Sequence, residues 1–154
     1  MVDSCFFYDS ELIKTVEKDD KYNYITINDN PHYAIIYGVD KKMVLSPDCK
    51  VVSASALQDC GIESIDFANV EFIGAYACQN DIRLKEIKMS EKVKIIDKNA
   101  FMFCALKEVT LPKSLKFLGA DAFYGCEELK VVKIPKTCKV GKNAFPKQCN
   151  VIYY

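Results

Sequence analysis

Residues 95–117, IIDKNAFMFCALKEVTLPKSLKF, and residues 118–139, LGADAFYGCEELKVVKIPKTCK, are two copies of one pattern. The second copy aligns with the first after a shift of 22 residues. A small residue before an aromatic position marks the register and recurs at intervals of 23, 22 and 22 residues, at Ala77, Ala100, Ala122 and Ala144. A weaker copy begins near Val52. Repetition this strict over about 100 residues is typical of a solenoid.

Each copy also carries a set of apolar residues with the spacing L-x-x-V-x-I. Its V-x-I half alternates, which predicts a short strand with one side in the core and the other in solvent. The members are Ile62, Ile65 and Phe67, then Leu84, Ile87 and Met89, then Leu106, Val109 and Leu111, then Leu129, Val132 and Ile134. One such unit cannot bury its own apolar face, so we expect the units to stack. Ala100, Ala122 and Ala144 should then lie in one file, and Phe101, Phe123 and Phe145 should form an aromatic column.

These segments closely resemble the BspA-like leucine-rich repeats, whose pattern is I-G-x-x-A-F-x-x-C-x-x-L-x-x-V-x-I-P-x-S-V. The match covers residues 52–154 and departs from the pattern at Cys78, Asp81 and Asp97. The resemblance implies an α/β leucine-rich-repeat solenoid of four to five units of 21–23 residues. It further implies short helical or 3-10 turns on the convex side and a concave strand face that serves as the recognition surface.

Residues 1–51 are less regular, and we interpret them as a small α+β N-terminal cap. The segment DSELIKTVEKDD, residues 9–20, predicts a short helix with Leu12, Ile13 and Val16 on one side. The alternation in residues 21–28, KYNYITIN, predicts a strand. Residues 32–47 read as a hairpin whose loop spans residues 38–42.

The eight cysteines do not form a metal or catalytic motif. There is no Cys-x-x-Cys, and the single histidine, His32, has no cysteine partner at ligand spacing. Cys60, Cys104 and Cys126 instead share one register of the repeat, which favours buried free thiols over disulfides.

Composition and motifs exclude several functions. Lys plus Arg and Asp plus Glu both number 21, so a uniformly basic nucleic-acid binder is disfavoured. No window is apolar enough for membrane insertion, and the N-terminus does not resemble a signal peptide. We therefore expect a cytoplasmic location, or a secreted or cell-surface one if the chain is a fragment of a longer protein. Without a phosphate loop, a calcium loop or a catalytic triad, we expect no enzyme activity, no cofactor and no metal.

Charge is distributed unevenly along the chain. Residues 1–78 hold 6 Lys or Arg and 13 Asp or Glu, whereas residues 79–154 hold 15 and 8. Lysines recur at equal places in the expected concave strands, and this is the basis of a candidate surface for a protein partner, which we expect to be acidic. The predicted partner-binding residues are Lys85, Glu86, Lys88, Lys107, Glu108, Thr110, Lys130 and Lys133. The alternative interpretation is that these lysines only increase solubility.

Two other roles stay open. Ile152, Tyr153 and Tyr154 fall where a further strand is expected, and an unpaired strand is an edge for self-association. The chain would then be a structural repeat protein that assembles end to end into rings or filaments. The resemblance also admits a fragment of a surface adhesin, because BspA-like proteins often act in cell adhesion.

Overall fold

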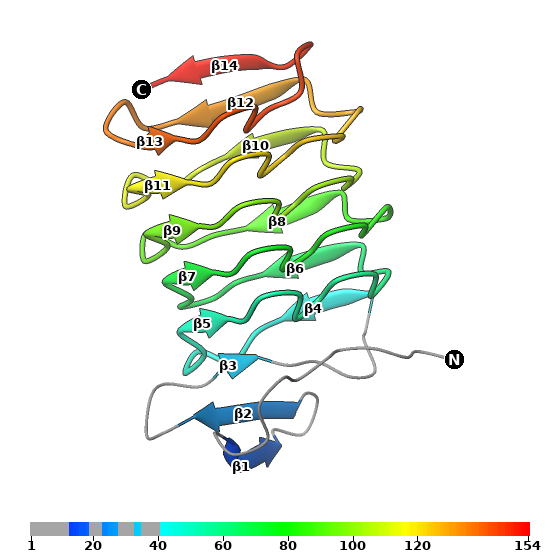
Figure 1. The fold of residues 1–154 in the computed structure, drawn as a ribbon, viewed down its shortest axis with the longest axis vertical. Helices are drawn as coiled ribbons and strands as arrows, with labels where there is room; N and C mark the ends of the chain where they lie inside the picture. Colours follow the sequence, from blue (N-terminus) through cyan, green and yellow to red (C-terminus); the bar gives the residue numbers. More distant parts are fainter. Residues whose placement is uncertain (1–12, 19–22, 28–32, 35–40) are drawn as a thin grey trace.

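The protein is a parallel β-solenoid of about 5 turns, seen here in a computed structural model that describes residues 13–18, 23–27, 33–34 and 41–154. Successive turns stack along the long axis, with β14 at one end (Figure 1). Each turn contributes one strand to either side of the stack. The predicted leucine-rich-repeat solenoid is therefore confirmed.

One side carries the strands of the V-x-I pattern, which we call the front strands. They are β4 (Lys42–Val44), β6 (Ser64–Asp66), β8 (Glu86–Lys88), β10 (Glu108–Thr110), β12 (Val131–Ile134) and β14 (Asn150–Tyr153). They pair in parallel within two three-stranded sheets, β4-β6-β8 and β10-β12-β14. Val109 lies opposite Val132, and Val132 opposite Val151, so equal places in the repeat are neighbours.

The other side is one eight-stranded sheet, which we call the back sheet. Its repeat strands are β5 (Val51–Val52), β7 (Phe72–Ile73), β9 (Ile95–Ile96), β11 (Phe117–Leu118) and β13 (Lys139–Val140). Three strands extend it at the N-terminal end: β1 (Ile13–Lys18), β2 (Asn23–Ile27) and β3 (Tyr33–Ala34). The pairs β1–β2 and β2–β3 are antiparallel, and from β3 onward the pairing is parallel.

The expected file of alanines is confirmed by hydrogen bonds between turns. The Cys78 amide donates to the carbonyl of Ala100 at 2.7 Å, and the amides of Phe101 and Phe123 donate to Ala122 and Ala144 at 2.8 Å. The aromatic column is confirmed as well. The ring centroids of Phe101 and Phe123 are 5.3 Å apart and those of Phe123 and Phe145 are 6.0 Å apart, both in stacked geometry.

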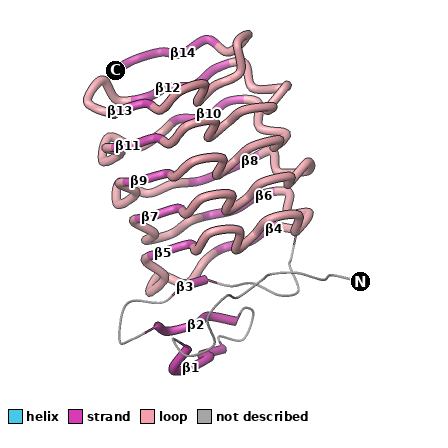
Figure 2. The backbone as a smooth tube through the Cα atoms, in the orientation of Figure 1, coloured by secondary structure: helices cyan, strands magenta, loops and turns pink. Residues whose placement is uncertain are grey.

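The expectation of helical or 3-10 turns is wrong, because no residue in the described ranges is helical (Figure 2). The segments between back and front strands contain residues in the left-handed region, such as Asn99 at φ 58° and Phe103 at φ 61°. A single left-handed residue breaks a right-handed helix. The amides of Phe101 and Phe103 donate to carbonyls of the next turn, and the Met102 amide donates to the Asn99 carbonyl in a single i→i−3 turn bond, so no i→i−4 ladder forms here.

Two predictions for the N-terminal segment are also wrong. Residues 13–18 of the predicted helix form β1, which pairs antiparallel with β2; the rest of that segment lies outside the described residues. β-branched Ile13, Thr15 and Val16 suit a strand once a partner strand is present. The hairpin is wrong because β3 pairs with β2 and β5 in the back sheet, whereas β4 pairs with β6 at the front. The strand predicted within residues 21–28 is confirmed as β2.

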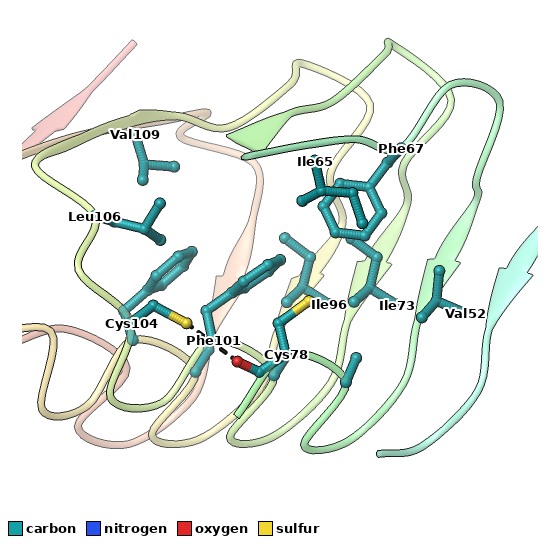
Figure 3. Close-up of a cluster of buried hydrophobic side chains, with 14 of the residues drawn as sticks. Val52, Ile65, Phe67, Ile73, Cys78, Ile96, Phe101, Cys104, Leu106 and Val109 are labelled. Carbon is teal, nitrogen blue, oxygen red and sulfur yellow. Dashed lines mark hydrogen bonds between the residues drawn. The ribbon is translucent and has the colours of Figure 1, made fainter. Parts of the chain in front are cut away.

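The space between the two sides is filled by one continuous apolar core (Figure 3). Phe67, from the end of a front strand, meets Phe101 edge-on with ring centroids 5.9 Å apart. Cys104 and Cys126 are buried thiols, as predicted, whereas Cys60 is half-buried. The thiol of Cys104 donates to the carbonyl of Cys78 at 3.2 Å, so the cysteine column contributes hydrogen bonds between turns.

Candidate protein-binding face

The outward side chains of the front strands form a surface that we call the front face. They fall into two rows that run along the solenoid axis. One row holds Lys42, Ser64, Glu86, Glu108, Val131 and Asn150, and the other holds Val44, Asp66, Lys88, Thr110, Lys133 and Ile152. The rows arise because alternate residues of a strand point to opposite sides, and the inward ones, such as Ile65 and Val132, are buried.

All eight predicted partner-binding residues are exposed and lie at or beside the front face. Five belong to the front strands themselves, namely Glu86, Lys88, Glu108, Thr110 and Lys133. The other three, Lys85, Lys107 and Lys130, each directly precede a front strand. The Lys130 amide donates to the carbonyl of Lys107 at 2.9 Å, which keeps these two residues adjacent in neighbouring turns.

Two of the five lysines form ion pairs. Lys88 Nζ lies 2.7 Å from Asp66 Oδ2 on the facing strand, and Lys107 Nζ lies 3.6 Å from Glu128 Oε2. Burial acts to raise the pKa of Asp66, but hydrogen bonds from Lys88 and the Ala68 amide together lower it below its ordinary value. The front face is therefore less basic than the lysine pattern suggested. The signal was in the sequence, because Asp66 lies one repeat before Lys88.

The front strands are interrupted between β8 and β10, a junction that we call the seam. Within the described residues these two strands do not pair, whereas β9 and β11 behind them do. Two surface pockets of about 520 and 500 Å³ flank the seam. Lys88, Glu108 and Ile87 line both, and Thr110 lines the second. The seam thus hollows the front face where five predicted residues line the pockets, namely Lys85, Glu86, Lys88, Glu108 and Thr110.

A difference in segment length marks the seam. The step from the cysteine column to the leading apolar residue is two residues at Cys60–Ile62 and three at Asp81–Leu84. It returns to two at Cys104–Leu106. β6 and β8, whose turns have steps of two and then three residues, pair with each other. β8 and β10, whose turns have steps of three and then two residues, do not. Sequence reasoning had treated all turns as equivalent and missed this feature.

The C-terminal strand β14, together with Tyr154 directly after it, carries the residues predicted to form a self-association edge. β14 pairs with β12 and with no other strand of the described chain. Ile152, Tyr153 and Tyr154 are 41, 52 and 41 % exposed. The Tyr154 hydroxyl also donates to the carbonyl of Leu111 at 2.5 Å, so this side chain reaches the second seam pocket.

The described part of the chain holds no group of three His, Cys, Asp or Glu side chains that could bind a metal ion. Across the same ranges, no helix has the length and apolar character needed to cross a bilayer.

Stacked L-x-x-V-x-I strands that alternate with back strands define a leucine-rich-repeat protein. The family model of the BspA type leucine rich repeat region matches residues 40–153 with six copies. The chain therefore belongs to the BspA-type leucine-rich-repeat family. Solenoids of this kind are generally non-enzymatic binding scaffolds, found in protein-interaction and surface proteins.

Solved bacterial structures share the fold. A leucine rich cell surface protein of Faecalibacterium prausnitzii matches 94% of the chain at 24% identity with a TM-score of 0.80, and the chain covers 40% of it. A leucine-rich repeat protein of Bacteroides capillosus matches 77% at 20% identity with a TM-score of 0.69, and 97% of it is covered.

A third structure, the pneumococcal vaccine antigen PcpA, matches 91% of the chain at 15% identity with a TM-score of 0.66, and 49% of it is covered. Comparison with curated proteins gives no match. The chain thus spans less than half of two of these three structures. The expected cytoplasmic location finds no support among them, since one of them is described as a cell surface protein.

Proposed function

We propose that the chain is a protein-binding module of a bacterial cell-surface protein and that a partner segment lies on the front face across the seam. The observation that carries this proposal is the break between β8 and β10. Lys88 and Glu108 line both pockets at this break, and Thr110 lines one of them. The cell-surface context is inferred from the description of the Faecalibacterium prausnitzii structure.

The charges of the front face favour an acidic partner segment. Lys85, Lys130 and Lys133 are exposed and make no ion pair with any described residue, whereas Lys88 and Lys107 are paired. The first three are therefore the cations available to a partner. Exposed cations of this kind raise association rates and set specificity more than they raise affinity. We assign Lys88 and Thr110 to contacts inside the seam.

A fluorescent decaglutamate peptide tests this surface through its anisotropy at low and physiological salt. The triple variant Lys85→Glu, Lys130→Glu and Lys133→Glu should lower its affinity by at least about tenfold, because attraction becomes repulsion. The effect should shrink above about 0.15 M salt, where the screening length falls to about 8 Å.

The matched control reverses three exposed lysines in the turns that follow the front strands, Lys92, Lys113 and Lys136. It makes the same change in net charge outside the front strands. A loss of binding equal to that of the first triple variant would show attraction by net charge alone. That result, or a first triple variant that binds like the wild type, would refute the proposed surface.

Self-association through β14 is a second candidate function, favoured by the exposure of Ile152, Tyr153 and Tyr154 on a strand with a single partner. Strand edges of this kind pair readily with another chain. Sedimentation over a range of concentrations would show concentration-dependent dimers in the wild type and monomers in Ile152→Lys. A wild type that stays monomeric at every concentration would exclude it.

A further inference from the structure

An exposed aromatic pocket lies away from the front face, on the segments that follow β9, β11 and β13. Phe103 and Tyr124 are 41 and 47 % exposed, and their rings meet edge to face with centroids 5.9 Å apart. Together with Phe145 they line a surface pocket of about 550 Å³. Single exposed apolar residues are ordinary, but three aromatic rings around one pocket are a feature of binding sites.

The backbone of Phe103 is held in the left-handed region, at φ 61°. The equivalent places in the other turns hold Asp59, Asn80 and Gly125, with φ between 57° and 72°. Aspartate, asparagine and glycine tolerate this conformation, whereas a bulky side chain there is strained. The ring is 41 % exposed, so burial offsets only part of that strain. Strained residues that persist in this way concentrate at functional sites.

The next turn makes room for the Phe103 ring. A Cβ atom added to Gly125 would lie 2.1 Å from Cδ1 and 2.3 Å from Cε1 of that ring. The ring therefore rests on the backbone of Gly125, with Tyr124 against its edge. These contacts fix the aromatic surface before any ligand arrives, and preorganised sites lose less conformational entropy on binding.

Polar groups of both hydrogen-bonding kinds share the pocket with the rings. Glu127 offers a carboxylate acceptor, Lys147 an ammonium donor, and the amide groups of Asn143 and Gln148 offer both. The Gln148 side-chain amide donates to the main-chain carbonyl of Glu127 at 3.2 Å, which orients it. Glu127 and Lys147 carry opposite charges, so this lining has no net charge.

We propose that this pocket binds a neutral pyranose unit of an oligosaccharide. The C–H face of a sugar ring would lie on Phe103 or Tyr124, because slightly positive hydrogens are attracted to the negative face of an aromatic ring. Its hydroxyl groups donate and accept hydrogen bonds at once, which matches the mixed lining of Glu127, Asn143 and Gln148. A proline-rich peptide fits less well, because it presents mainly acceptors and would leave the Glu127 carboxylate without a donor.

Titration of the full chain with maltoheptaose, cellopentaose, chitopentaose and mannopentaose, followed by amide NMR shifts, tests this proposal. At least one of these four should bind with a Kd of about 1 mM or tighter. Its shifts should centre on residues 103, 124 and 143–148. Phe103→Asn and Tyr124→Ala should each weaken binding by about tenfold, equivalent to about 1.4 kcal/mol. Asparagine tolerates the left-handed backbone, so Phe103→Asn should keep its Tm.

The matched control is Phe117→Asn, which removes a ring that is 40 % exposed on the back sheet and should leave saccharide binding unchanged. The proposal is overturned if none of the four saccharides binds, or if both pocket variants bind like the wild type. Decaproline that displaces or replaces the saccharide would reassign the pocket to a peptide. The front-face triple variant should keep saccharide binding, so this result is independent of the proposed protein-binding face.

Discussion

The two halves of the solenoid fill the same core in different ways. In the C-terminal half, residues 90–154, the aromatic position is filled in three consecutive turns, by Phe101, Phe123 and Phe145. In the N-terminal half, residues 41–89, the equivalent places hold the smaller Leu57 and Cys78. The seam of the front face lies between these halves.

The missing aromatic volume of the N-terminal half comes from another position of the repeat. Phe67 occupies the last place of the V-x-I pattern, where other turns carry Leu45, Met89 or Leu111. Its ring is fully buried and packs edge-on against Phe101. An aromatic side chain thus fills the core of this half from a different position of the repeat, an exchange that the dense packing of protein interiors favours.

The largest effect on stability is expected from a substitution in the C-terminal half, which we call the regular half because its aromatic position is filled in every turn; the N-terminal half is then the irregular half. Phe123 is fully buried between two stacked rings, so Phe123→Ala leaves a cavity in the middle of the column. We expect a loss of about 3–5 kcal/mol in the free energy of unfolding, measured by urea denaturation. Tyr124→Ala, at the exposed neighbouring position, should change it by less than about 1 kcal/mol. Equal losses from both variants would show that the column is not the principal core.

Asp81 distinguishes the irregular half through its charge. It replaces the cysteine of the other turns and is fully buried; its Oδ1 accepts the Gly61 amide at 2.7 Å, whereas Oδ2 has no partner. Burial raises the pKa of this carboxyl to about 7 from 3.8, although hydrogen bonds from backbone amides oppose the rise. The folded state therefore binds this proton more tightly than the unfolded state, so the contribution of Asp81 to stability is greatest below pH 4 and is lost as the pH rises from about 4 to about 7.

Asp81→Asn should remove this pH dependence, because the amide cannot ionise and keeps an acceptor for Gly61. Relative to the wild type, the variant should gain up to about 4 kcal/mol between pH 4 and pH 8, measured by denaturation across that range. Cys104→Asp, one turn further in the same column, should introduce the same kind of loss into the regular half. Parallel pH profiles for the wild type and Asp81→Asn would contradict the assignment.

The smallest effect on the free energy of unfolding is expected when an aromatic side chain is moved from one position of the repeat to another. Cys78→Phe restores the regular aromatic position but overfills a fully buried site one turn before Phe101, whose ring packs against Phe67, and this should cost about 1–3 kcal/mol. The double variant Cys78→Phe with Phe67→Leu should recover much of that loss, because the two sites share one volume. A double-mutant cycle measures this coupling. Strictly additive effects would mean that Phe67 does not compensate for Cys78.

Much of the architecture could be predicted because equal spacing makes equal residues into neighbours. The alanine file, the aromatic column and the exposed lysines of the front strands all follow from the recurrence of Ala100, Phe101 and Lys107 at about one-turn intervals. Local periodicity wrongly predicted a short helix at residues 9–20. Residues 13–18 form a strand because they pair with β2, which is a tertiary interaction that local periodicity does not contain.

The candidate site was only partly predictable. Its lysines were visible as a pattern, but the ion pairs of Lys88 and Lys107 depend on which side chains meet across neighbouring turns. The seam coincides with a one-residue difference in step length between turns, which a comparison of whole repeats does not reveal. The aromatic pocket escaped sequence reasoning because Phe103, Tyr124 and Phe145 do not share one repeat position, so no column revealed them.

The buried thiols have a consequence for where such a protein can operate. Cys126 donates to the Phe101 carbonyl at 3.0 Å, and burial raises the pKa of Cys78 well above its usual value. A thiol that stays protonated and shielded reacts slowly with oxidants and with other disulfides. The Cys78 sulfur can therefore stay reduced even in an oxidising exterior, so this buried thiol does not by itself indicate a reducing compartment.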